Sequence, residues 1–75
     1  MNGKMNTIPE NTVYKMIYDQ LDHISREVKS DGRKRTIVYP LKIWNLVADA
    51  IIKTIDFTIL NVNVSNRSKL TITRR

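Results

Sequence analysis

The spacing of the apolar residues changes along this chain, and that change constrains the fold more than any other feature. Between residues 13 and 28, apolar residues recur every three or four positions, which is the repeat of one α-helical stripe. The stripe consists of Val13, Ile17, Leu21, Ile24 and Val28. Residues 69–74 (KLTITR) instead alternate polar and apolar side chains, which is typical of a half-buried β-strand. A chain with both repeats predicts an α+β fold.

The first helix is predicted to run from about residue 8 to residue 29. Thr7 and Glu10 have the spacing of a capping box, and Pro9 falls in the first turn, where its missing N–H does no harm. Gly32 follows the last apolar residue of the stripe and suits the left-handed position that ends many helices.

A short strand and a second helix are predicted next. Residues 36–39 (TIVY) are β-branched or aromatic, and Pro40 both ends this strand and opens a helix over residues 41–55. The apolar face of that helix is unusually broad, so we expect it to be covered on two sides, by the rest of the domain or by a second copy. Its apolar residues are Ile43, Trp44, Leu46, Val47, Ala48, Ala50, Ile51, Ile52 and Ile55.

The second strand is predicted over residues 57–64, with a polar turn at 65–68 and the third strand at 69–74. In the second predicted strand, the apolar residues lie at odd positions as far as Ile59 and at even positions from Leu60 onwards. Such a change of parity predicts a bulge near Leu60 or burial on both faces of the strand.

The order α-β-α-β-β predicts two helices packed on a small, three-stranded, mainly antiparallel sheet. Two arrangements of the strands are open: the first strand lies parallel beside the second, or the third strand lies between them. We favour the second arrangement because it makes every pairing antiparallel and places the most regular strand in the middle.

The length of 75 residues predicts one domain over residues 7–75, preceded by a flexible tail over residues 1–6. A core this small gives little stability, and the chain has no cysteine that could form disulfides. We therefore expect a homodimer or higher homo-oligomer, and the lack of cysteine favours a cytoplasmic location. No apolar run reaches the length of a membrane span, so no membrane partner is expected.

The charge is distributed unevenly along the chain. Of the net charge of +6, residues 33–75 contribute nine basic against two acidic side chains, whereas residues 1–32 carry a slight acidic excess. Such asymmetry is typical of proteins that bind a polyanion. The candidate nucleic-acid-binding residues are Arg33, Lys34, Arg35, Arg67, Lys69, Arg74 and Arg75. The alternative interpretation is that these cations protect exposed sheet edges from aggregation.

Little in the chain suggests catalysis. The one histidine, His23, lies beside Asp22 and one turn from Asp19, but these side chains spread around the helix, and we interpret them as a solvated flank. There is no glycine-rich phosphate loop and no pairing of a nucleophile with a base, so we predict a protein that is not an enzyme and holds no cofactor or metal.

These patterns favour a small, basic nucleic-acid-binding protein that contacts the phosphates of DNA or RNA with little base specificity. The small size of the chain and its high content of Ile, Asn and Lys are typical of phage or mobile-element proteins. Trp44 and Phe57 are expected in the core, which leaves Tyr39 as the aromatic residue nearest the cations. The alternative is a modulator or inhibitor of a host protein, acting through its sheet edge or its apolar second helix.

Overall fold

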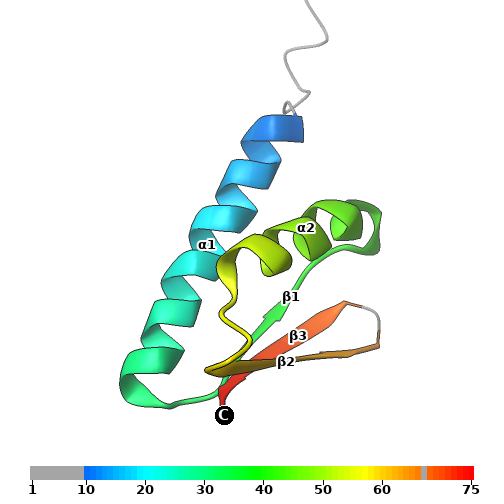
Figure 1. The fold of residues 1–75 in the computed structure, drawn as a ribbon. Helices are drawn as coiled ribbons and strands as arrows, with labels where there is room; N and C mark the ends of the chain where they lie inside the picture. The colour runs from blue at the N-terminus through cyan, green and yellow to red at the C-terminus, as the bar shows by residue number, and fades with distance from the viewer. Residues whose placement is uncertain (1–9, 67) are drawn as a thin grey trace, which may run out of the picture.

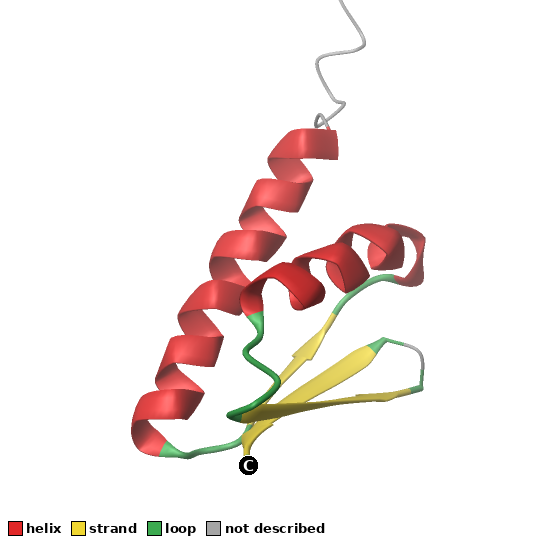
Figure 2. Ribbon diagram, in the orientation of Figure 1, coloured by secondary structure: helices red, strands yellow, loops and turns green. Residues whose placement is uncertain are grey.

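The computed structural model describes residues 10–66 and 68–75. Both helices lie on the same side of a three-stranded sheet, so the molecule has two layers (Figures 1 and 2). The elements are α1 (Glu10–Asp31), β1 (Arg35–Val38), a one-turn 3₁₀-helix (Leu41–Ile43), α2 (Trp44–Thr54), β2 (Leu60–Ser65) and β3 (Lys69–Arg74). The predicted α+β class and the order of its elements are confirmed.

Three predictions fall on residues that lie outside the described part of the chain. They are the tail over residues 1–6, the start of the first helix with the capping-box residue Thr7 and the first-turn residue Pro9, and the candidate binding residue Arg67. At the other end of α1 the prediction is confirmed: Gly32 has a φ of 75°, and its N–H donates to the carbonyl of Val28 at 2.9 Å. A left-handed residue there turns the chain toward β1.

The strands pair in the order β1-β3-β2, and both pairings are antiparallel. The predicted insertion of the third strand between the other two is therefore confirmed. Arg35 stands opposite Ile72, and Leu60 stands opposite Arg74. The start of β1 and the end of β3 consequently meet at the same end of the sheet.

The prediction of a strand from Phe57 with a bulge near Leu60 is wrong. Residues 57–59 form a turn in which the carbonyl of Asp56 accepts from the N–H of Ile59 at 3.0 Å and of Leu60 at 2.9 Å. The parity of the apolar residues changes because a turn ends there, and β2 itself keeps an unbroken register. Phe57, expected in the core, is 46% exposed on this turn.

The core lies between the helical layer and the inner face of the sheet. It is formed by Ile17, Leu21 and Val28 from α1, Val47, Ala50 and Ile51 from α2, and Leu60, Leu70 and Ile72 from the strands, together with Tyr39 and Ile55. Trp44 is partly buried and packs against this core from the start of α2. α2 contributes Val47, Ala50 and Ile51 to this core, whereas Ile52 on the same helix is 71% exposed.

The buried Tyr39 links the sheet to α1 and makes the stability depend on pH. Its hydroxyl donates to Oε1 of Gln20 at 2.7 Å, and burial raises the pKa of Tyr39 to about 12, from the ordinary value of 10.0. The folded state therefore holds this proton more tightly than the unfolded state does, so stability present below pH 10 is lost as the pH rises toward 12.

We expect urea denaturation to detect this linkage. Between about pH 8 and about pH 11, the free energy of unfolding should fall by about 1 kcal/mol more in the wild type than in Tyr39→Phe. Phenylalanine keeps the ring in the core, and Gln20 is exposed enough for water to replace the lost hydroxyl. If the free energy of unfolding falls equally in the wild type and in Tyr39→Phe, the raised pKa of Tyr39 is contradicted.

Candidate nucleic-acid interface

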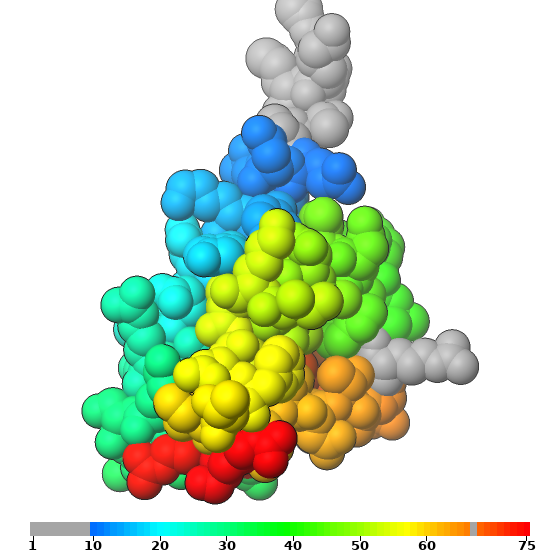
Figure 3. Space-filling model, viewed as in Figure 1, coloured from blue at the N-terminus to red at the C-terminus, as the bar shows by residue number. Residues whose placement is uncertain are grey.

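The register of the sheet gathers five of the predicted cations at one end of the molecule. β1 begins beside the residues that end β3, and the guanidinium of Arg74 lies over Gly32, 3.4 Å from where a Cβ on that glycine would stand. Figure 3 shows the end of β3, in red, beside the green residues that follow α1. We call this region the basic end; it comprises Lys29, Arg33, Lys34, Arg35, Arg74 and Arg75.

Two of these cations attach the last turn of α1 to the sheet. Arg35 binds the carboxylate of Asp31 through Nη2 at 2.8 Å and approaches Glu27 through Nε at 3.5 Å. Arg74 donates from Nη1 to the carbonyl of Lys29 at 2.8 Å, where the helix exposes unpaired carbonyls. The backbone N–H of Arg33 and the guanidinium of Arg35 together lower the pKa of Asp31. Arg35 and Arg74 thus have a clear structural role.

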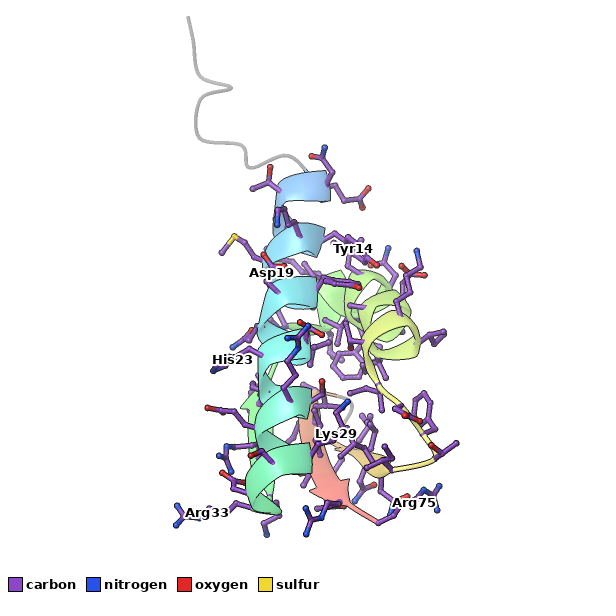
Figure 4. The ribbon with its side chains drawn as sticks, turned by 60° about the vertical axis from the view of Figure 1, so that its left-hand side comes forward. Tyr14, Asp19, His23, Lys29, Arg33 and Arg75 are labelled. Carbon is purple, nitrogen blue, oxygen red and sulfur yellow. The ribbon has the colours of Figure 1, made fainter. Side chains whose placement is uncertain are left out.

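The other cations of the basic end are more available to a ligand. Arg33 and Lys34 are exposed, and neither has an acidic partner within salt-bridge distance in the described chain. Arg75 uses Nε to donate to the carbonyl of Phe57 at 2.7 Å, which leaves its terminal nitrogens for other acceptors. Figure 4 shows Arg33 and Arg75 pointing away from the core on two sides of the basic end.

The structure does not bring Lys69 into this cluster. Lys69 stands opposite Val38 and Ser65, at the hairpin end of the sheet. The predicted site is therefore divided between the two ends of β3, which are about 17 Å apart for a six-residue strand.

Between these two ends lies a polar surface that the sequence analysis did not identify. The helices cover only one face of the sheet, and the other face is open in the described part of the molecule (Figure 2). Strand alternation places on this open face Thr36, Val38, Asn61, Asn63, Ser65, Lys69, Thr71 and Thr73. The clean polar alternation of residues 60–65 was a usable signal, but the erroneous strand start at Phe57 obscured it.

No strand carries an acidic residue. The seven carboxylates belong to α1, to Asp49 of α2 and to Asp56 in the α2–β2 connection. Most are paired on their own helix, as in Lys15–Asp19 at 3.0 Å and Lys53–Asp49 at 3.3 Å. The helical layer is therefore close to neutral, and the excess positive charge lies on the sheet and its ends.

The open face does not include an aromatic side chain. Tyr14 and Tyr18 lie on α1 with their ring centroids 6.1 Å apart, Tyr39 is buried, and Trp44 and Phe57 are outside the strands. The open face therefore offers no aromatic ring on which a base could stack. The polar groups and cations of this face suit contacts with phosphates and sugars instead.

A second surface feature is an apolar groove of about 690 Å³ on the opposite layer. It lies between the N-terminal half of α1 and the segment that joins β1 to α2. Its walls are Val13, Met16, Ile17, Asp19, Gln20, Tyr39 and Ile43. The sequence analysis did not predict it, and Met16 in its wall is 64% exposed.

The residues considered for a metal site are dispersed, as Figure 4 shows for Asp19 and His23. His23 instead lies 3.3 Å from Glu27 on the same helix. Within residues 10–66 and 68–75, three potential metal ligands are never grouped, and neither helix has the length and apolar character needed to cross a membrane. No protein-family model, curated protein or solved structure matches this chain.

Proposed function

We propose that this protein binds nucleic acid by contacting phosphates along the open face of its sheet and at the basic end. The observation that carries the proposal is the segregation of charge: the strands carry no acidic residue, and cations stand at both ends of the open face. Along the strands a polyanion meets hydrogen-bond donors and no carboxylate, and at the basic end the carboxylate of Asp31 is paired with Arg35.

The dimensions of the sheet fit a phosphate backbone. The roughly 17 Å between the ends of β3 equals the rise of about five base pairs along the axis of duplex DNA. Threonine hydroxyls and asparagine amides between the cations can donate hydrogen bonds to phosphate or sugar oxygens. Because these groups do not read base edges in a fixed pattern, binding is expected to depend weakly on sequence.

The test removes the two exposed cations that have no described acidic partner. Arg33→Ala/Lys34→Ala is expected to weaken binding to a mixed-sequence DNA duplex and to make its salt dependence shallower. The slope of log K against log salt should fall in magnitude by up to about 1.8, because each phosphate contact contributes roughly 0.9. Fluorescence anisotropy at several salt concentrations measures both quantities, and a single-stranded RNA probe separates the two nucleic acids.

Lys15→Ala/Lys53→Ala is the matched control, because it removes the same charge from exposed positions on the helical layer. Arg35 stays unchanged in both variants, since its loss would remove the guanidinium that binds Asp31 and attaches α1 to the sheet, and would mix folding with binding. Equal loss of affinity in the two double variants would contradict the assigned surface. The proposal fails outright if the wild type binds neither probe at low salt.

The alternative function is binding to a protein partner. The apolar groove beside Tyr39 and the exposed Met16 favour this role, because an apolar cleft of that size accepts side chains of a partner. The two roles respond differently to salt: phosphate binding weakens steeply with salt, whereas association through the groove should change little.

A further inference from the structure

The two edges of the sheet differ in how well they are protected against pairing with another strand. β1 has four residues, begins within the basic run and ends two residues before Pro40, and these features discourage strand addition. β2 has six residues, with the sequence LNVNVS, and contains no charge, proline or glycine. Among residues 10–66 and 68–75, no other strand pairs with the outer edge of β2, which is therefore open to another strand, although the chain as a whole carries a charge of +6.

The hydrogen bonds to β3 determine which groups of β2 are left at this edge. The N–H of Arg75 donates to the carbonyl of Ile59 at 2.7 Å, so alternation assigns Asn61 and Asn63 to the bonds with β3. Val62 and Val64 then direct their N–H and C=O groups away from the sheet. These four backbone groups are the template for a further strand.

We infer that β2 pairs with β2 of a second copy of this chain, antiparallel and around a two-fold axis at Asn63. This register sets Asn63 opposite Asn63 of the second copy and joins each Val62 to the Val64 of the other copy by backbone hydrogen bonds. The valines meet on the inner face and the polar residues meet on the open face, so the strand is complementary to itself.

Exposed apolar residues on β2 and beside it support an interface at this edge. Val64 is 43% exposed on β2, and Phe57 and Ile59, in the turn that leads into β2, are 46% and 39% exposed. In Figure 1 this turn leads directly into β2, which forms one edge of the sheet. A second copy on this edge covers apolar surface while bringing no charged strand residues together.

The two-fold axis stands perpendicular to the sheet, so pairing makes one six-stranded sheet with both helical layers on the same side. The two open faces become continuous, still without an acidic residue on any strand. Self-association does not rest on the proposed nucleic-acid binding, and its test contains no nucleic acid.

The test exploits the position of Asn63 at the axis. In sedimentation experiments, the wild type is expected to approach twice the monomer mass of 8.8 kDa as its concentration rises. Asn63→Lys sets two ammonium groups opposite each other and should weaken the dimer roughly tenfold or more. Because Asn63 is exposed, the substitution leaves the monomer core intact, which the circular dichroism spectrum verifies.

Two further variants make the test specific. Thr36→Lys adds the same charge to the same open face on β1, so it should leave the dimer unchanged. An equimolar mixture of Asn63→Lys and Asn63→Glu should recover the association that each loses alone, because only this register sets the two side chains face to face. A monomeric wild type, an unaffected Asn63→Lys protein or a mixture without recovery would each overturn the inference.

Discussion

Replacing Leu21 with alanine is expected to lower the free energy of unfolding by about 3–5 kcal/mol. Leu21 is fully buried at the middle of the stripe that α1 packs against the sheet and α2. Alanine leaves a cavity there that the surrounding layers fill only in part. The free energy of unfolding of so small a domain is only a few kcal/mol. Denaturant titration should therefore show that the Leu21→Ala protein is largely unfolded or close to it.

The control for this substitution is Met16→Ala on the same helix. Met16 is 64% exposed, so its loss should change the stability by no more than about 0.5 kcal/mol. Trp44, which the sequence favours as a core residue, is only partly buried, and its replacement should cost less than that of Leu21. A larger loss for Trp44→Ala than for Leu21→Ala would contradict the packing described above.

The second large effect is expected from acidic residues placed on the open face. Thr36→Glu/Asn61→Asp should weaken nucleic-acid binding at low salt on the order of 10- to 100-fold, because two carboxylates then face the phosphates. Both positions are exposed, and they lie on different strands, on either side of β3. Anisotropy titration measures the affinity, and thermal melting checks that the sheet is retained.

Asn11→Asp/Asn45→Asp provides the matched comparison, since it lowers the net charge equally at exposed positions on α1 and α2. If net charge alone attracts the polyanion, the two double variants lose affinity to the same degree. If the open face is the binding surface, the helical variant retains most of the wild-type affinity. Similar losses in both would therefore remove the open face from the proposal and leave only a diffuse electrostatic attraction.

Part of the candidate site was accessible from the sequence. The run Arg33-Lys34-Arg35 and the pair Arg74-Arg75 stand out in the chain, and the antiparallel pairing of the first and third strands, once formed, places both groups at one end of the sheet. Their individual roles were not accessible. Which arginine binds a carboxylate or a helix carbonyl depends on where α1 ends above the sheet, and that is a matter of tertiary packing.

The open face and the unprotected β2 edge also required the structure. Alternation in a strand separates two faces, but it does not state which face the helices cover or which strands lie at the edges. The turn after Asp56 also required the structure. Its apolar residues Phe57 and Ile59 alternate as in a strand, although local hydrogen bonds hold residues 57–59 in a turn.

The sequence by itself determined the elements of this protein and their order. Local signals sufficed for this: the three-to-four-residue repeat of α1, the left-handed Gly32, and the alternation of β3, each of which acts within a few residues. Only the tertiary structure decided how charge is shared between surfaces. Contacts between distant segments tie Arg35 and Arg74 to the end of α1 and leave the strand face without acids, and no local pattern encodes such contacts.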